Sequence, residues 1–341
     1  MNNLRLAHKI ASKDKSYYKE VQEIDSFPDY YLYEIQKMLI NKTYTCEPKD
    51  YTMFTKMDKG KLREIYKLSY APHRIVQWAI MLQIQDVFLN LFIDRTYSSI
   101  PHRGIHKALK QLNYDLKCHK EDVTYCYKLD IKKYYPNIDQ EILKKLLRKK
   151  FKDKDLLWLL DTIIDSRGKG NGLPIGSLLS QWLGNFYLSY FDHWILEDKK
   201  IHYYYRYADD IVILSNSKSE LHKLKNEIHD YLEGKLNLTI KNTEQIFPTF
   251  VRAIDFVGYR HFGDYILLRK NTAKQFKRKM RNIAKKCNIN TDLLTYKDFC
   301  TVNSYKGWLK WCNSYNLQQK YMRPLEDSLE LYYQTNIKKK G

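Results

Sequence analysis

Residues 203–215 read YYYRYADDIVILS, an aromatic run and an aliphatic run separated by two adjacent carboxylates, Asp209 and Asp210. Both runs consist of residues that favour strands, so the pattern predicts a β-hairpin that carries its acids at the turn. Asp-Asp is also ordinary turn chemistry. Adjacent carboxylates nevertheless repel each other and resist desolvation, and a bound cation removes both costs. The stretch therefore indicates either a simple acidic turn or a metal site.

A second acid occurs in a similar setting upstream. Residues 125–136 read YCYKLDIKKYYP, in which a short strand ends at Asp130 and Pro136 prevents it from continuing. Strand-end acids on two separate strands can converge on one pair of ions. Two Mg²⁺ ions about 4 Å apart, held by carboxylates and substrate phosphates, support nucleotidyl transfer. Asp130 and Asp209 are therefore the predicted ligands, and Asp210 is a weaker or indirect one.

The composition restricts the class of protein and its partners. The 341 residues, 44% of them hydrophobic, suffice for one large domain or for two to three subdomains. A formal charge of +20 favours nucleic acid as the partner, ahead of a membrane surface. The six cysteines form no Cys-x-x-Cys pair, and no apolar run is long enough for a signal peptide or a spanning helix. We expect a cytoplasmic protein without a membrane partner.

Helical patterns flank these strands. Residues 1–50 are expected to be helical, with Ile35, Met38 and Leu39 on one apolar face. Further helices are predicted over residues 72–94 and 218–232.

Three stretches together resemble the motif series of a prokaryotic reverse transcriptase. They read LDIKKYY at residues 129–135, YADD at 207–210 and FVGY at 256–259. The resemblance extends from about residue 59 to residue 259. It implies an α+β right-hand polymerase with fingers, an antiparallel-sheet palm and a short helical thumb. The implied domains are an N-terminal segment with fingers at 1–123, a palm at 124–263 with an insertion around 140–172, and a basic thumb at 264–341.

The resemblance also implies a metal set and a chemistry. Its catalytic residues correspond to Asp130, Asp209 and Asp210, and Ile131 joins them as a metal-binding position. The implied cofactor is a pair of Mg²⁺ ions, with Mn²⁺ as a substitute.

Residues 54–66 predict a hairpin with Asp-Lys-Gly at its turn and cations on both sides. A solvated basic turn is the alternative interpretation. In the resembled family this hairpin folds over the incoming dNTP. Arg63 would then clamp phosphate, because a guanidinium is planar and bidentate, with Lys59 or Lys61 assisting.

The remaining dNTP contacts are implied by position. Arg103 corresponds to a basic residue that faces template or triphosphate. Tyr135 corresponds to the steric gate that excludes a 2′-hydroxyl, with a packed core tyrosine as the alternative. Lys241 corresponds to a lysine that protonates the leaving pyrophosphate. Ile175 and Gly176 complete the dNTP-binding set.

Residues 173–183 read LPIGSLLSQWL, which predicts a turn, a cap at Ser177 and a helix that buries one face. Most reverse transcriptases carry Gln-Gly and Ser-Pro where this chain has Ile175-Gly176 and Ser180-Gln181. That combination is similar to the reverse transcriptases of diversity-generating retroelements, which copy a template-repeat RNA with errors at adenines. Loss of a polar contact at Ile175 relaxes discrimination, so Ile175, with Arg63, is the predicted fidelity position.

The C-terminal residues 265–341 carry 17 Lys and Arg against 5 Asp and Glu. Residues 270–287 predict a helix with Phe276, Met280 and Ile283 inward. The cations expected to face outward and bind duplex phosphates are Lys274, Lys277, Arg278, Arg281 and Lys285.

Two further nucleic-acid contacts are implied by the resemblance. They are Tyr207, and Gly258, whose missing side chain would let the backbone approach the primer strand. Trp308, Trp311 and Tyr315 are expected to form a small helical core.

The predicted function is RNA-directed DNA synthesis with adenine-directed errors. The implied partners are template RNA, the cDNA in its RNA–DNA hybrid, dNTPs and a small oligomeric accessory variability protein. One alternative is a retron, abortive-infection or intron-related reverse transcriptase without adenine mutagenesis. The other is a non-catalytic polymerase fold that serves as an RNA-binding scaffold.

Overall fold

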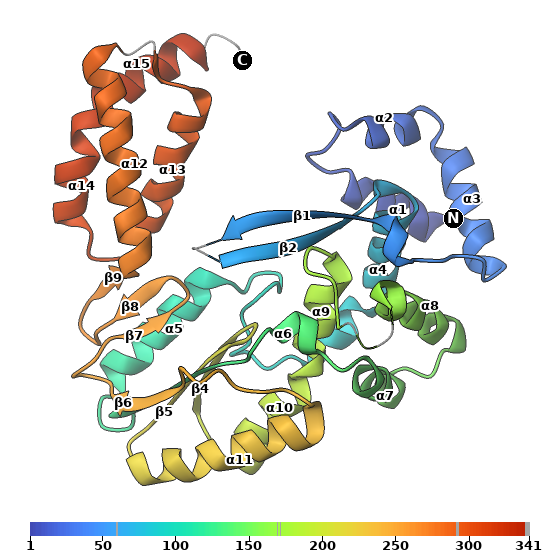
Figure 1. The fold of residues 1–341 in the computed structure, drawn as a ribbon, viewed down its shortest axis with the longest axis horizontal. Helices are drawn as coiled ribbons and strands as arrows, with labels where there is room; N and C mark the ends of the chain where they lie inside the picture. Colours follow the sequence, from blue (N-terminus) through green and yellow to red (C-terminus); the bar gives the residue numbers. More distant parts are fainter. Residues whose placement is uncertain (59–60, 169, 171, 291–292, 338–341) are drawn as a thin grey trace. The chain divides into compact units, whose positions relative to one another are not determined.

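The computed structural model describes residues 1–58, 61–168, 170, 172–290 and 293–337 (Figure 1). The chain divides into two compact units. The first comprises residues 1–104, 127–213 and 218–245, and the second comprises residues 105–126, 214–217 and 246–341. Among the described residues, no helix is long and apolar enough to cross a membrane.

The first unit begins with three helices, which confirms the helical prediction for this segment. They are α1 (Asn2–Ala11), α2 (Lys19–Ser26) and α3 (Pro28–Ile40). The buried face of α3 runs through Leu32 and Ile35. Met38 is 36% exposed, so its predicted inward position is wrong. The 3.6-residue helical period continues this face toward Leu39 instead.

A two-stranded antiparallel hairpin follows, as predicted. It consists of β1 (Tyr51–Asp58) and β2 (Lys61–Leu68), with Lys56 opposite Arg63. Lys59 lies outside the described residues, and the structure describes only the backbone of Lys61. After a π-helical turn, η2 (Tyr70–Arg74), comes the largely buried helix α4 (Ile75–Leu91), which confirms the predicted helix.

A four-stranded sheet in the order β4-β5-β3-β6 carries the acidic stretches. The strands are β3 (Tyr125–Asp130), β4 (Tyr203–Tyr207), β5 (Asp210–Ser215) and β6 (Gln245–Pro248). The predicted hairpin with acids at its turn is therefore present as β4 and β5. Its helical neighbours are α9 (Leu178–Tyr187), α10 (Ser189–His193), η4 (Trp194–Asp198) and α11 (Lys218–Leu236).

Aromatic contacts join α10 to the sheet and to α11. The ring of Phe191 on α10 lies 6.4 Å from that of Tyr204 on β4 and 5.4 Å from that of Tyr231 on α11. The segment between β3 and α9 is helical and contains α6 (Tyr134–Asn137), α7 (Gln140–Lys150), α8 (Lys154–Ile164) and η3 (Asp165–Arg167).

The second unit contains α5 (Ile105–Cys118), a small antiparallel sheet and a group of helices (Figure 1). The sheet consists of β7 (Ile254–Phe256), β8 (Tyr259–His261) and β9 (Ile266–Leu268). The helices are α12 (Lys270–Ile289), α13 (Tyr296–Leu309), α14 (Tyr315–Tyr321), η6 (Arg323–Leu325) and α15 (Glu326–Asn336).

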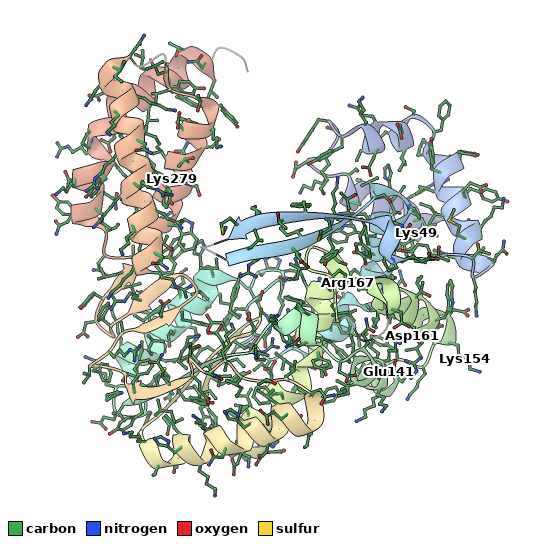
Figure 2. The ribbon with its side chains drawn as sticks, viewed as in Figure 1. Lys49, Glu141, Lys154, Asp161, Arg167 and Lys279 are labelled. Atoms are coloured by element: carbon green, nitrogen blue, oxygen red, sulfur yellow. The ribbon has the colours of Figure 1, made fainter. Side chains whose placement is uncertain are left out.

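Helix α12 has the predicted amphipathic character. Phe276, Met280 and Ile283 are buried. The basic side chains outside this face include Lys279, labelled in Figure 2. The predicted outward residues Lys274, Arg278, Arg281 and Lys285 are exposed, and Lys277 is half-buried.

The predicted aromatic core of this unit is confirmed in part. Trp308 stacks on Tyr259 with ring centroids 5.3 Å apart, and Trp311 stacks on His106 at 4.3 Å. Tyr315 is 73% exposed, so its core position is wrong. It begins α14, a short helix without a buried residue.

The structure gives Gly258 a packing role within the second unit. It lies in the two-residue turn between β7 and β8, where Val257 has a φ of 45° and Gly258 a φ of 91°. A Cβ at Gly258 would lie 2.6 Å from the Trp308 ring. The packing of Trp308 therefore requires a glycine here, and the predicted approach of a primer strand to this turn stays a prediction.

We expect Gly258→Ala to lower the free energy of unfolding of the second unit by about 2 kcal/mol, because the new Cβ meets Trp308 in a backbone conformation that favours glycine. Combining it with Trp308→Leu should recover the steric part of this loss in a double-mutant cycle followed by urea unfolding. Strictly additive losses in the double variant would contradict the contact.

Candidate active site

Two of the predicted acids converge on one lysine. Asp130 ends β3, and Asp209 lies in the turn between β4 and β5. The Lys241 Nζ atom lies 3.0 Å from Asp130 Oδ1 and 3.6 Å from Asp209 Oδ2. The backbone reinforces this arrangement, since the Ile131 N–H donates to the Asp209 carbonyl at 3.1 Å and the Lys241 N–H donates to the Asp130 carbonyl at 2.8 Å.

The electrostatics of this cluster favour a bound cation. Burial raises the pKa of Asp209; the Lys241 ammonium opposes that rise, the Asp130 carboxylate adds to it, and the Arg63 guanidinium also opposes it. The ionised acid pair is therefore costly unless positive charge is close.

The donor set fits a hard divalent cation. Asp130 and Asp209 are each 36% exposed and present carboxylate oxygens to a single positive charge. Within the part of the chain that the structure describes, no group of three or more acidic, His or Cys side chains is arranged to hold a metal. A Mg²⁺ ion at the pair would thus take its remaining oxygen ligands from water or substrate phosphates.

Asp210 has a separate partner. It begins β5 and forms an ion pair with Lys128 of β3, and the two side chains are only 21% and 14% exposed. This contact separates Asp210 from the Asp130–Asp209 pair, in line with its predicted weaker role. Lys128 was not among the predicted site residues. It is the one cation within the aromatic and apolar stretch YCYKLD, which could have indicated a buried partner for an acid.

A fully buried ion pair holds the turn that carries Asp209. Arg206 and Asp192 are both 0% exposed, and Arg206 Nε donates to Asp192 Oδ1 at 2.7 Å. The same guanidinium donates to Asn185 Oδ1 at 3.2 Å and to the Ala208 carbonyl at 3.3 Å. Ala208 has a left-handed φ of 55°.

The Asp192 carboxylate also accepts hydrogen bonds from two hydroxyl groups. It accepts hydrogen bonds from Tyr204 Oη at 2.6 Å and from Thr96 Oγ1 at 3.2 Å. Burial of this kind is tolerated only when each charge is paired and hydrogen-bonded. This network was not predicted from the sequence. The signal that could have indicated it is the arginine within the aromatic run YYYRY.

Tyr135 is coupled electrostatically to Asp209, and its predicted contact with the sugar stays a prediction. Burial raises its pKa to about 12, with a further contribution from the Asp209 charge. A Cβ at Gly184 of α9 would lie 2.9 Å from the Tyr135 ring, so the absence of a side chain there makes room for this tyrosine. Tyr207, at the end of β4, is half-buried and also acts electrostatically on Tyr135.

The Ile175-Gly176 turn is attached to the hairpin of β1 and β2. The Tyr66 N–H donates to the Ile175 carbonyl at 2.9 Å. Gly176 has a φ of 112°, and a Cβ there would lie 3.0 Å from the Tyr66 carbonyl oxygen. The contact joins the predicted fidelity position to the strand that carries Arg63, which is exposed and acts on Asp209 through its charge.

Ser177 precedes α9, but its predicted capping role is wrong. Its hydroxyl donates to Gln77 Oε1 at 3.1 Å and does not cap the helix. The same Gln77 oxygen accepts from the Leu179 N–H at 3.4 Å, so a side chain from α4 replaces the serine as the cap. The predicted apolar face of α9 is confirmed by the buried residues Leu179, Trp182, Leu183 and Phe186.

Arg103 has partners within the protein, and its predicted contact with template or triphosphate stays a prediction. Its guanidinium donates to the Phe92 and Ile93 carbonyls at 3.3 and 2.6 Å and pairs with Asp94 at 3.4 Å. Both carbonyls follow the last residue of α4, Leu91, so Arg103 supplies donors to the chain where it leaves this helix. Its side chain is 15% exposed.

Comparison with known proteins agrees with this geometry. Residues 40–261 match the family model described as reverse transcriptase (RNA-dependent DNA polymerase). The chain belongs to the reverse transcriptase family. The predicted α+β right-hand polymerase fold, with antiparallel sheets, is thereby confirmed.

Several proteins are similar to this reverse transcriptase. Protein YkfC of Escherichia coli is 24% identical over an alignment of 242 residues, and the match covers 59% of this chain and 63% of YkfC. Nuclear intron maturase 4, mitochondrial, of Arabidopsis thaliana is 30% identical over 149 residues, 41% of this chain and 18% of the maturase. Group II intron-encoded protein LtrA of Lactococcus lactis is 25% identical over 183 residues, 51% of this chain and 30% of LtrA.

The chain therefore spans less than two thirds of each of these relatives.

Among solved structures, telomerase from Candida albicans with a fragment of telomeric RNA aligns with a TM-score of 0.49 and 12% identity, covering 90% of this chain and 65% of the telomerase chain.

We expect Asp192→Ala to lower the free energy of unfolding by about 3–5 kcal/mol, because it leaves the Arg206 guanidinium buried without a counter-charge. Urea unfolding measures the loss. Asp29→Ala, which removes the exposed pair with Arg5, is the matched control and should cost less than about 1 kcal/mol. Equal losses in the two variants would contradict the role of the buried pair.

Lys241→Met should raise the pKa of Asp209 further, since the ammonium opposes the rise that burial causes. The protonated acid then persists to higher pH in the folded protein. The carboxyl ¹³C shift of Asp209, assigned with Asp209→Asn and followed by NMR in metal-free protein, reports this pKa. Lys225→Met, which removes the pair with Glu244, should leave it unchanged, and a lowered pKa in Lys241→Met would refute the prediction.

Proposed function

We propose that this reverse transcriptase is an active RNA-directed DNA polymerase. The observation that carries the proposal is the convergence of Asp130 and Asp209 on Lys241, at 3.0 and 3.6 Å, within the region that matches the family. Carboxylates brought together at this energetic cost are typical of a site that receives cations during function.

The acids have distinct roles in this proposal. Asp130 and Asp209 would hold the metal ions with Ile131, and Asp210 would support them while paired with Lys128. Two Mg²⁺ ions, or Mn²⁺ in their place, would when bound ease deprotonation of a 3′-hydroxyl and stabilise the leaving pyrophosphate. Lys241, beside both carboxylates, would supply a proton to that leaving group.

The nucleotide contacts are proposed from neighbouring elements. Arg63 on β2 would clamp phosphate, assisted by Lys59 or Lys61, and its electrostatic influence on Asp209 supports this. Tyr135 would lie under the sugar and exclude a 2′-hydroxyl. The Ile175-Gly176 turn would contact the nascent pair.

We assign the fingers, palm and thumb to three consecutive ranges of the sequence. Residues 1–123 would serve as N-terminal segment and fingers, 124–263 as palm and 264–341 as thumb. The thumb cations on α12, with Tyr207 in the palm, would bind template RNA and its hybrid with cDNA. We also propose a cytoplasmic location, which the bacterial relatives support.

The finer proposal is adenine-directed mutagenesis with a small accessory variability protein as partner. It is supported by the Ile175-Gly176 and Ser180-Gln181 combination. The second candidate is an intron-related polymerase without this mutagenesis, supported by similarity to a group II intron-encoded protein and an intron maturase. A non-catalytic RNA-binding scaffold is the third, disfavoured by the intact acid pair.

We expect the purified protein to extend a primer on a mixed-sequence RNA with Mg²⁺ and all four dNTPs, and Asp209→Asn to lose more than about 10³-fold of the rate. Asp29→Asn, which changes an exposed acid of α3, should retain full activity. An inactive wild type that still binds RNA would favour the scaffold.

Sequencing the cDNA tests the finer proposal in the same reactions, with the accessory protein added where one is encoded nearby. Errors concentrated opposite template adenines support adenine mutagenesis, and Ile175→Gln should then raise fidelity. An even, low error rate would leave the polymerase in place and favour the intron-related candidate.

A further inference from the structure

Helices α7 and α8, with Asp165 at the start of η3, line an open surface cavity of about 460 Å³ on the first unit. Two of its residues, Lys154 and Asp161, are labelled on α8 in Figure 2. The cavity is lined by Arg148, Lys154, Leu157, Trp158, Asp161, Thr162 and Asp165. None of these residues belongs to the proposed polymerase site, and the volume is in the range of pockets that hold small ligands.

Trp158 supplies an aromatic surface that the fold does not use. Its side chain is half-buried, and it stacks on no other aromatic ring among the described residues. Leu157 beside it is also half-buried. A planar, partly apolar ligand such as a nucleobase stacks favourably on an indole of this kind.

The polar groups of the cavity are held in place by ion pairs. Arg148 forms a two-pronged contact with Asp161, in which Nη1 lies 3.2 Å from Oδ1. Lys144 Nζ lies 2.7 Å from Asp165 Oδ1. The two carboxylates can accept hydrogen bonds from the N–H groups of a base, and the fixed guanidinium, 46% exposed, can donate to a phosphate.

Lys154 adds an available positive charge. It is exposed at the first position of α8 and forms no ion pair with a residue that the structure describes. Asp153 caps α8 by accepting from the Leu156 N–H at 2.7 Å, so the nearest acid in sequence is engaged with the backbone.

The surface around the cavity is strongly basic. Residues 144–154 contain seven Lys or Arg and a single acid. Six of the seven are exposed, namely Lys145, Arg148, Lys149, Lys150, Lys152 and Lys154. Such a concentration of like charge is unfavourable unless a polyanion neutralises it.

We infer that this cavity binds a nucleoside phosphate, with the base on Trp158 and the phosphate between Lys154 and Arg148. The surrounding lysines favour an unpaired nucleotide of an RNA chain over a free nucleotide, because adjacent phosphates then meet the remaining charges. The site would hold RNA outside the polymerase centre and goes beyond the proposed function.

The test uses the full-length protein carrying Asp209→Asn, so that the absence of DNA synthesis does not affect the result. Single-stranded RNA containing 4-thiouridine is crosslinked to it, and the adduct is located by mass spectrometry. We expect an adduct within residues 154–162. Binding of the same RNA, measured by fluorescence anisotropy, should weaken about 5- to 100-fold in Trp158→Leu, with little change in its salt dependence.

A charge variant separates the phosphate contact from stacking and does not disturb the packed interior. Lys154→Gln should weaken binding and reduce the salt slope by about 0.7, the value for one phosphate of a single strand. Lys223→Gln, an exposed lysine of α11, is the matched control and should leave the crosslinked peptide and the affinity unchanged.

The source of the nucleotide is decided by a second titration with AMP. Binding of AMP that Trp158→Leu abolishes, together with unchanged RNA binding, would support the cavity with a free nucleotide as its ligand. The inference is overturned if Trp158→Leu, shown to be folded by its thermal transition, binds both RNA and AMP like its parent and the adduct maps elsewhere.

Discussion

The buried ion pair between Arg206 and Asp192 is the constraint on which the geometry of the acidic turn depends. Both side chains are fully excluded from solvent, and the guanidinium reaches the Ala208 carbonyl at 3.3 Å. Because an isolated charge is so costly in the interior, the pair permits few alternative positions for either residue. The strand before the turn, the helix that carries Asp192 and the left-handed residue before Asp209 are thereby held together.

The Arg206–Asp192 pair fixes the turn, so Asp209 is held near Asp130 although their negative charges repel each other. Burial and the charge of Asp130 both act against ionisation of Asp209, and Lys241 compensates only in part. An added cation would relieve this cost, which supports the proposed metal site. The same principle explains why Lys128 is placed on Asp210, where it neutralises the second acid without competing for the first.

Positive charge is distributed unevenly over the chain, and this bears on how nucleic acid is held. The basic residues of α12 are typical of backbone binding without sequence preference. The basic residues of α7 differ, because they border a cavity lined by Trp158, whose indole stacks on no other described aromatic ring. Arg103 differs from both groups, because its guanidinium donates hydrogen bonds to the Phe92 and Ile93 carbonyls.

The sequence by itself determined the class of fold and placed Asp130 and Asp209 at the ends of strand-forming stretches. Alternating strand patterns that end in Asp130 and Asp209, and the amphipathic period of residues 270–287, are local properties that can be read without a structure. The hairpin of β1 and β2, the hairpin of β4 and β5 and the helix α4 followed from such patterns, whereas the strand order β4-β5-β3-β6 came only from the structure.

Only the tertiary structure decided which partner each polar group takes. Local pattern suggested that Ser177 caps α9, yet its hydroxyl donates to Gln77 of α4, and Arg103 and Gly258 have contacts within the protein that neither pattern nor resemblance indicated. The buried Arg206–Asp192 pair was likewise not predicted from the sequence. Hydrogen bonds and burial depend on long-range packing, which a single sequence without its fold does not specify.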